Sequence, residues 1–305
     1  YIFDTIISKP EKLLISLMPQ MIGLDEVVIE SKVQNSNTVV GNEPGLIKIS
    51  PKVAIFLPGN RSNTVYNLLR LQPGILAAAE QSKDFMTWGS YQGQTQIVFD
   101  GITLFNLGSY NDNIGAINPF IVKDIEIYKG AYNVNVGDRV GGFVNVTGLT
   151  GNYKKFGGEI SADNQLVNGG INIPIGKRNA LQVMFIKSYE DQLSPYIYYK
   201  NKIVEENTYT VDQKFTDINF KFSGYTNSGD NYFVSLIGNR DFSENIFFDT
   251  KNDFSSSLTD SEQNQLGGSI FYEKNWSRLG KTNFTIAGSS MNVNKRGVIQ
   301  NFDSL

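Results

Sequence analysis

Asp241 and Glu244 are the acidic side chains whose spacing comes nearest to catalytic use, because paired carboxylates perform acid and base chemistry in glycoside hydrolysis. No recognised motif frames this pair. The 305 residues include neither His nor Cys, which excludes imidazole-dependent triads, thiol nucleophiles, disulfides and thiolate zinc sites. Residues 137–142 are glycine-rich but lack the Lys-Ser/Thr ending of a phosphate-binding loop. We therefore expect a protein that is not an enzyme and that holds no metal ion or cofactor.

The composition favours an envelope or secreted β protein. Lys and Arg number 27 and Asp and Glu number 30, a formal charge of −3, which gives no reason to expect a nucleic-acid partner. Aromatic residues reach 12% and there are 29 glycines, whereas charged residues are only 19%. No apolar run approaches the roughly 20 residues of a membrane helix, but the alternating strands of a membrane barrel remain compatible with this composition.

Strict alternation of apolar and polar residues dominates after residue 151. Ile218, Phe220 and Phe222, for example, alternate with Asn219 and Lys221. Such stretches predict about seven strands with one apolar face. Short turns at 176–179, 227–230 and 277–281 alternate with longer polar segments at 189–213 and 241–263, a pattern typical of outer-membrane barrels.

Seven strands cannot close such a barrel, and an open edge would aggregate. The chain begins at Tyr1 without a leader, and residues 294–305 form no predicted closing strand. We therefore expect a sequence truncated at both ends.

The first half has a different texture, with short strands and Gly or Asn turns. Residues 31–45 form a polar tract that predicts a linker. Residues 65–71 have helical spacing that stops at a Pro-Gly pair. The predicted strands are 96–99, 102–105, 124–128 and 143–147, with a helical turn at 119–122 and a polar loop at 106–113.

Four of these segments resemble, in order, the plug domain of TonB-dependent outer-membrane receptors of the type common in Bacteroidota. They are the helix at 65–71 with its Pro-Gly-Ile ending, QIVFDGITL at 96–104, NPFIVKDIEIYKG at 118–130 and VGDRVGGFVNV at 136–146.

The resemblance implies a mainly β fold: a small α+β plug domain followed by antiparallel strands of a transmembrane barrel with about 22 strands when complete. It divides the chain into the end of a preceding small β domain (1–23), a TonB box and linker (24–50), the plug (51–150) and the N-terminal part of the barrel (151–305).

The hexad Leu24, Asp25, Glu26, Val27, Val28 and Ile29 resembles the TonB box of these receptors. A β-prone segment on a flexible tether is able to add to the edge of a partner's sheet, although an ordinary strand is the alternative. The resemblance implies a periplasmic N-terminus and TonB of the inner-membrane TonB-ExbB-ExbD complex as partner. It also implies contact with outer-membrane lipids and leaves open a surface lipoprotein partner.

The resemblance assigns two sets of residues. The first set holds the plug together: Asp100, Gly101, Glu126, Gly130, Gly137, Arg139, Gly141 and Gly142. We expect its glycines to permit tight turns and close backbone approach, and Glu126 and Arg139 to contact the barrel wall. The second set faces an unknown small ligand, unless its Asn and Gly residues only make turns: Trp88, Tyr91, Gln94, Phe105, Asn106, Tyr110, Asn111 and Asn113.

Two departures from the family pattern matter. Thr87-Trp88-Gly89 replaces the Ile-Arg-Gly element of many plugs, and the Lys129-Gly130 ending argues against an obligatory SusD-like lid.

The function implied is TonB-energised import of a scarce nutrient: a siderophore, cobalamin, an oligosaccharide or a peptide. The alternatives are a receptor that signals, assembles or binds without transport, and a secreted β-rich binding protein.

Overall fold

The computed structural model divides the chain into two compact units, Tyr1–Ser36 and Asn37–Leu305. The segments that it describes all belong to the second unit: 38–40, 45–50, 64–77, 85–91, 93–105, 117–130, 136–137, 139–163, 166–189, 208–249, 255–276 and 280–301. The predicted TonB box and the small β domain before it lie outside these segments.

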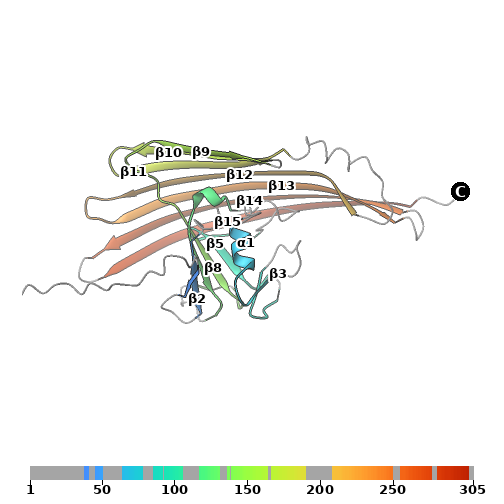
Figure 1. The fold of residues 1–305 in the computed structure, drawn as a ribbon, viewed down its shortest axis with the longest axis horizontal. Coiled ribbons are helices and arrows are strands. Elements are labelled where there is room, and N and C mark those ends of the chain that lie inside the picture. Colours follow the sequence, from blue (N-terminus) through green and yellow to red (C-terminus); the bar gives the residue numbers. More distant parts are fainter. Residues whose placement is uncertain are drawn as a thin grey trace, which may run out of the picture. The chain divides into compact units, whose positions relative to one another are not determined.

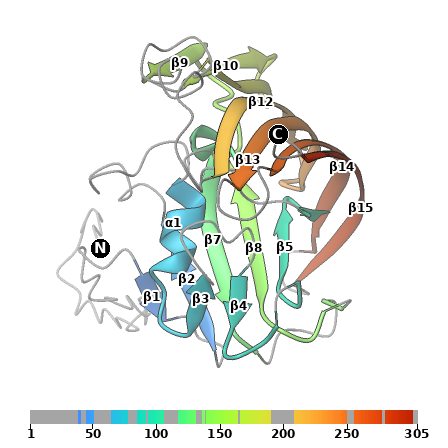
Figure 2. The ribbon, with the colours of Figure 1, turned by 90° about the vertical axis from the view of Figure 1, so that its right-hand side faces the viewer.

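The N-terminal part of the second unit is built on a six-stranded sheet. Its order is β1-β2-β7-β8-β5-β6, and every pairing is antiparallel except β5 with β8. Figure 2 shows β7, β8 and β5 side by side, with α1 next to them. The strands are β1 (Thr38–Val40), β2 (Leu46–Ile49), β5 (Gln96–Phe99), β6 (Ile102–Thr103), β7 (Val122–Tyr128) and β8 (Phe143–Gly148).

Three smaller elements complete this part, namely α1 (Thr64–Arg70) and the antiparallel pair β3 (Ile75–Ala77) and β4 (Phe85–Thr87). Val65, Leu68 and Leu69 of α1 are buried, as the 3.6-residue period of a helix requires. A 3-10 helix at Pro119–Ile121 leads into β7, capped by the Asn118 side chain, which accepts the Phe120 N–H.

The C-terminal part is one sheet of seven consecutive antiparallel strands (Figure 1). This confirms the predicted strand count, and within the described residues β9 and β15 are the edges of an open sheet. The strands are β9 (Gly157–Ala162), β10 (Leu166–Ile175), β11 (Asn179–Ser188), β12 (Thr208–Tyr225), β13 (Asn231–Asp249), β14 (Ser255–Asn275) and β15 (Lys281–Asn301).

The two faces of this sheet differ in polarity. Cross-strand register places Phe220 beside Leu236, and Ile270 beside Ile286, on one exposed face. We call this the outer face. The opposite, inner face carries buried polar side chains: Asn219, Lys221, Ser223, Ser235, Gln265 and Ser269. Apolar residues outside and polar residues inside invert the pattern of a soluble protein. No helix among the described residues is long and apolar enough to cross a membrane.

The N-terminal part packs against the inner face. Met184 of β11 and Ile237 of β13 belong to the same buried cluster as Phe99, Ile102 and Ile127. The predicted fold class is confirmed: a mainly β chain, with a small α+β part followed by antiparallel strands. Below, "plug" denotes the described residues up to Thr150, and "wall" denotes the seven-stranded sheet.

The predicted loop at 241–263 is wrong. β13 continues to Asp249 and β14 begins at Ser255, so that Asp241 pairs with Gln263. β15 likewise extends to Asn301. The first half of β14, residues 255–263, is polar at every position except Leu258. A strand without alternation resembles a loop in sequence.

The predicted linker also contains sheet. Thr38–Val40 forms β1 and pairs with β2, which in turn pairs with β7. These three β-branched residues lie among Asn and Gly, so the composition of the tract hides them. The six-stranded sheet therefore begins before residue 51, where the plug was expected to start.

Candidate functional site

The turn between β5 and β6 places a carboxylate at the wall. Asp100 and Gly101 both have positive φ, +49° and +87°, as the tightest two-residue hairpin turns require. Asp tolerates this conformation better than most residues, and Gly adopts it freely. A side chain on Gly101 would also meet Thr285 and Ala287 of β15, at 3.2 and 3.7 Å from its Cβ. Asp100 and Gly101 therefore form the tight turn of this hairpin, and Gly101 lies against β15.

A buried ion pair fixes this turn to the wall. Lys221 Nζ, on the inner face of β12, lies 2.7 Å from Asp100 Oδ2, and each side chain is only 1% exposed. Lys221 also donates to the Gly148 carbonyl (2.9 Å), and Asp100 Oδ1 accepts the Gly148 N–H (2.9 Å). The Phe233 ring centroid is 4.3 Å from Nζ. With these partners the two buried charges are paired and hydrogen-bonded, as burial requires.

Two further polar links join plug and wall. Gln265 of β14 donates from Nε2 to the Thr103 carbonyl (2.9 Å) and accepts the Phe105 N–H at Oε1 (3.3 Å). Asn118 and Asn168 of β10 exchange a reciprocal pair of amide hydrogen bonds at 2.8 and 3.1 Å. Both Asn side chains and Gln265 are buried. Each link therefore satisfies groups that would be costly to leave unpaired.

These contacts orient the β5–β6 hairpin along the wall. Gly101 meets Thr285 and Ala287, which pair with Phe271 and Ser269 of β14. Phe105 instead meets Gln265, which lies farther along β14 from the short turn at 276–280. The Asp100–Gly101 turn thus points toward the end of the sheet with short turns, and Phe105 toward the opposite end.

The loop before β5 presents two exposed aromatic side chains. Trp88 is 68% exposed and Tyr91 is 78% exposed. Gln94 holds the loop closed, because its side chain accepts the Tyr91 N–H (2.9 Å) and its backbone N–H donates to the Tyr91 carbonyl (3.1 Å). Phe105, 43% exposed, follows β6 at the same end of the hairpin. The topology therefore gathers four of the predicted ligand-facing residues at the end of the hairpin away from the short turns.

The other four predicted ligand-facing residues lie outside the described segments: Asn106, Tyr110, Asn111 and Asn113.

Among the described residues, Glu126 forms its ion pair within the plug and not with the wall. It pairs with Lys48 of β2 at 2.8 Å and accepts from Asn145 of β8 at 3.4 Å, both within the plug sheet. Arg139 donates to the Gly93 carbonyl, also within the plug. Asp100 is a plug residue that does pair with a charged wall residue, Lys221.

The predicted glycines have unequal roles. A Cβ on Gly142 would lie 2.5 Å from Thr87 Oγ1, and one on Gly141 would lie 2.8 Å from the Gln94 carbonyl oxygen. Close approach is therefore real there, but it occurs inside the plug and not at the wall. Around Gly130 and Gly137 no described atom comes within 4 Å of an added Cβ, although the Gly130 carbonyl oxygen lies 3.4 Å from a Cβ added to Gly45.

Sequence reasoning missed the wall side of every link: Lys221, Gln265 and Asn168. Alternation placed Lys221 on a polar face, but nothing local indicates its partner. The available signal was the charge of Lys221, because the neighbouring polar positions of the same strand hold the uncharged residues Asn219 and Ser223.

The carboxylate pair considered for catalysis is not brought together. Asp241 is buried on the inner face of β13, whereas Glu244, three residues on, lies on the outer face. Across the described segments, no group of three or more acidic side chains is arranged to hold a metal ion.

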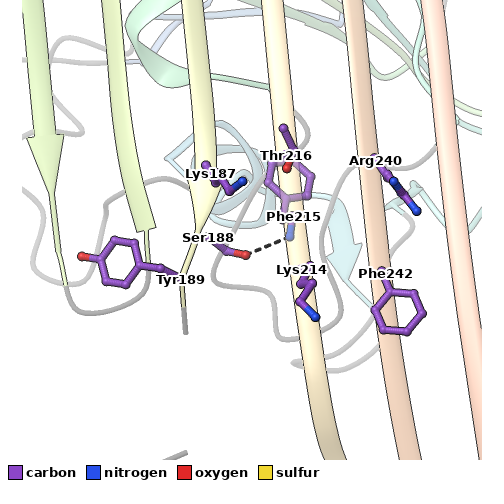
Figure 3. Close-up of a pocket in the computed structure, with 8 residues that line it drawn as sticks. All are labelled: Lys187, Ser188, Tyr189, Lys214, Phe215, Thr216, Arg240 and Phe242. Carbon is purple, nitrogen blue, oxygen red and sulfur yellow. Dashed lines mark hydrogen bonds between the residues drawn. The ribbon is translucent and has the colours of Figure 1, made fainter. Parts of the chain in front are cut away.

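The outer face carries a basic pocket of about 580 Å³ where β11 ends beside β12 (Figure 3). The Ser188 hydroxyl accepts the Phe215 N–H there (2.8 Å) and ends the pairing of these strands. Three cationic residues line the pocket, Lys187, Lys214 and Arg240.

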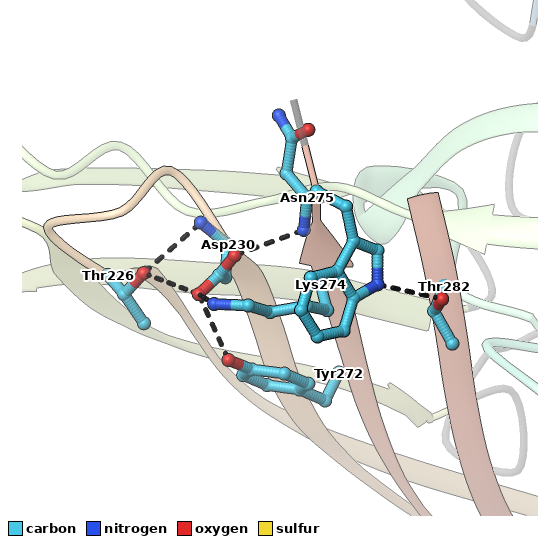
Figure 4. A network of polar contacts seen from close by, with 7 residues as sticks. Thr226, Asp230, Tyr272, Lys274, Asn275 and Thr282 are labelled. Carbon is cyan, nitrogen blue, oxygen red and sulfur yellow. Dashed lines mark hydrogen bonds and ion pairs between the residues drawn. The ribbon is translucent and has the colours of Figure 1, made fainter. Parts of the chain in front are cut away.

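A polar network closes the turn between β12 and β13 (Figure 4). Asp230, 2% exposed, accepts hydrogen bonds from Lys274 Nζ (2.9 Å), Tyr272 OH (3.0 Å) and the Asn275 N–H (3.1 Å). The bond from Lys274 is the main reason that the pKa of Asp230 is lowered to about 2, and the Asn275 N–H adds to it. This carboxylate ties the turn to the end of β14.

Comparisons with known proteins agree with this architecture. Residues 57–143 match the family described as TonB-dependent Receptor Plug Domain. No curated protein sequence matches the chain.

Among solved structures, the copper transporter OprC is similar at 12% identity and a TM-score of 0.56, over 85% of this chain and 48% of that one. The FpvAI–pyocin S2 complex is similar at 11% identity and a TM-score of 0.53, over 89% and 45%. A mutant of the ferric enterobactin receptor PfeA from Pseudomonas aeruginosa gives 12% identity and 0.47, over 84% and 47%. The chain thus spans slightly less than half the length of these structures. The likeness to the first two structures shows the fold: a plug followed by antiparallel strands that resemble a barrel wall.

Proposed function

We propose that this chain supplies the plug and the first wall strands of a TonB-dependent outer-membrane receptor of the Bacteroidota type, which imports a scarce nutrient. The observation that carries the proposal is the docking of a plug-family domain on the polar inner face of a sheet whose outer face is apolar. Such a sheet is suited to lipid on one side and to a filled lumen on the other.

The ligand would bind at the end of the plug away from the short turns. Trp88, Tyr91 and Phe105 offer exposed aromatic surface there for stacking, and Gln94 shapes the loop. Aromatic rings with neighbouring amides suit a sugar or an organic chelate. In this proposal the short turns are periplasmic, so these residues face outward. A siderophore, cobalamin, an oligosaccharide and a peptide are the candidate ligand classes.

Energy would enter from the N-terminal side. TonB pairs with residues 24–29 by strand addition. A pull there loads β1 first, because among the described strands β1 pairs with β2 alone. The load then reaches β7 and β8, and through Gly148 the Asp100–Lys221 pair. Opening a path would require these plug–wall links to break or to move with the wall.

The test is a proline substitution in the proposed TonB box. Proline removes an N–H and disrupts strand pairing, so Val27→Pro in the natural polypeptide should abolish binding to the purified periplasmic domain of TonB. Val33→Pro, in the polar tract nearby, is the matched control and should bind normally. Equal binding of Val27→Pro and the parent would sink the TonB-box assignment, and recovery of the natural polypeptide in the soluble fraction would sink the outer-membrane location.

Import is tested separately in cells. A strain lacking the protein should grow poorly when a ferric siderophore, cobalamin, an oligosaccharide or a peptide is the limiting nutrient. The parent gene should restore growth on one of them, and the Val27→Pro gene should not. Ligand binding without restored growth would favour a receptor that does not transport.

A further inference from the structure

We propose that the wall holds a second docking position for the plug, at which the Asp100 carboxylate leaves Lys221 and is received by the hydroxyls of Ser235 and Ser269, while Gln182 receives Lys221. The inference rests on the proposed function and deepens it, because it states how the buried ion pair separates when the plug moves. Ser235, Ser269 and Gln182 are then positioning residues for the moving plug.

Lys221 belongs to one cross-strand row on the inner face. From β10 to β15 the row consists of Asn172, Gln182, Lys221, Ser235, Ser269 and Ala287. Neighbouring strands lie about 4.8 Å apart. Gln182 is therefore one strand from Lys221 on one side, and Ser235 is one strand from it on the other, with Ser269 one strand farther on.

Three members of this row carry a buried polar atom that makes no hydrogen bond in the structure. The atoms are Gln182 Oε1, Ser235 Oγ and Ser269 Oγ. All three residues are buried, at 5%, 1% and 3% exposure. A buried polar atom without a partner is costly, and native proteins contain few of them. Three in one row, on both sides of a buried ion pair, indicate a contact that the docked plug does not make.

The Asp100 carboxylate lies near β13, the strand that carries Ser235. Lys221 Nζ is 2.7 Å from Asp100 Oδ2 and 4.3 Å from the centroid of the Phe233 ring on β13. Phe233 and Ser235 are two residues apart and share the inner face. A shift of the carboxylate by about one strand spacing, roughly 5 Å, therefore brings it to the Ser235 hydroxyl.

Gly101 extends the same turn across β14, the strand that carries Ser269. A Cβ added to Gly101 would lie 3.7 Å from Ala287 Cβ on β15, and Ala287 pairs with Ser269. The next plug residue, Ile102, lies so close to Gly267 of β14 that an added Cβ there would overlap its side chain. Gly267 and Ser269 are two residues apart on one face, so Ser269 lies beside the turn.

The chemistry of the row suits two charges that separate. Hydroxyls donate hydrogen bonds to a carboxylate, and an amide oxygen accepts them from an ammonium group. Ser235 and Ser269 can therefore satisfy Asp100 on one side, and Gln182 can satisfy Lys221 on the other. Hydrogen bonds to charged groups are the stronger kind, so these partners lower the cost of separating two buried charges.

The experiment measures the exposure of the plug hairpin after Asp100 has lost its ammonium partner. Hydrogen exchange of β5 and β6 is followed by mass spectrometry in the natural polypeptide, purified in detergent. The four proteins are the parent, Lys221→Met, the serine pair (Ser235→Ala with Ser269→Ala), and the triple variant with all three substitutions.

The serine pair should exchange like the parent, because its hydroxyls have no partner while the plug is docked. Lys221→Met should exchange faster, since two hydroxyls replace an ammonium group only in part. The triple variant should exchange at least about tenfold faster than Lys221→Met, because the carboxylate then loses two charge-assisted hydrogen bonds.

The matched control is Ser243→Ala with Ser261→Ala. These serines also pair in register on β13 and β14, eight residues farther along each strand. Like Ser235 and Ser269 they belong to the inner face, and Ser261 Oγ also makes no hydrogen bond in the structure. Added to Lys221→Met, the control pair should leave the exchange of β5 and β6 unchanged.

Two further variants test each side of the row. Lys221→Ser with Ser235→Lys exchanges the two residues, and it should restore an exchange rate close to that of the parent, whereas Lys221→Ser alone should not. Gln182→Leu should be neutral in the parent and should raise the exchange of Asp100→Asn, in which Lys221 has lost its carboxylate.

Faster exchange in the serine pair than in the parent would overturn the proposal, because the serines would then already hold the docked plug. This comparison needs no variant that lacks Lys221 to fold. Equal exchange of Lys221→Met and the triple variant would also overturn it, as would a residue exchange that behaves like Lys221→Ser. No effect of Gln182→Leu in Asp100→Asn would overturn the role of Gln182. Failure of the receptor proposal appears elsewhere, in the TonB-binding and fractionation tests above.

Discussion

At the scale of single residues, the Asp100–Lys221 pair is the most constrained contact between plug and wall. The hairpin turn needs at position 100 a residue that tolerates positive φ. The Asp100 carboxylate also accepts hydrogen bonds from Lys221 Nζ and from the Gly148 N–H. Turn geometry and docking therefore depend on one side chain. Removing either charge leaves the other buried without compensation, which typically costs about 3–5 kcal/mol.

We accordingly expect Lys221→Met to lower the free energy of unfolding by about 3–5 kcal/mol and to increase hydrogen exchange in β5, β6 and β8. The double variant with Asp100→Asn should recover much of this loss, because it contains no unpaired buried charge and Asn also tolerates positive φ. Urea unfolding of the natural polypeptide measures the cycle.

The matched control is the exposed ion pair Lys48–Glu126, in which Lys48 is 54% exposed. Lys48→Met should cost no more than about 1 kcal/mol. If Lys221→Met were as mild as Lys48→Met, the buried pair would not hold the plug in place.

At the scale of elements, the turn between β12 and β13 is stabilised by one ionised carboxylate. The pKa of Asp230 is lowered to about 2 by the hydrogen bond from Lys274 and by the Asn275 N–H. A depressed pKa in the folded state means that the contribution of Asp230 is complete above its unfolded pKa of about 3.9. It is then lost progressively as the pH falls toward 2.

Asp230→Asn should therefore be less stable than the parent at pH 5, and the difference should shrink between about pH 4 and pH 2. Urea unfolding of both proteins across this range isolates Asp230 from the other carboxylates, which titrate alike in both. A difference that is constant with pH would show that the charge of Asp230 does not stabilise the turn.

The sequence indicates elements better than it indicates contacts between them. Ile218, Phe220 and Phe222 alternate strictly, and β12 lies where they predict it. The first half of β14 is polar at nearly every position, so it lacks the alternation by which a strand is predicted from sequence. The partner of Asp100 lies 121 residues away, and no local pattern encodes such a distance. The candidate ligand loop was found only through resemblance, whereas its closure by Gln94 follows from the structure.

At the scale of the whole unit, the sheet places its apolar residues outside and its polar residues against the plug. This inversion predicts a depth-dependent response to charge on the outer face. Ile286, 57% exposed, lies within the apolar rows of β15, and Asn292 lies on the same face of the same strand, at the level of Arg240. In a membrane barrel, Arg costs about 2–4 kcal/mol at the midplane and about 0–1 near the interface.

Ile286→Arg should impair assembly because the row that it shares with Val234 and Ile270 is apolar. Asn292→Arg should leave assembly nearly unchanged because its row already holds Arg240 and Asn264. Heat-modifiable migration of the natural polypeptide, together with its abundance in outer-membrane fractions, measures assembly. In a water-soluble protein Ile286 is already exposed, so an Arg there would be harmless or would improve solubility. Equal assembly of the two variants would thus place the outer face in water, and the receptor proposal would fall with it.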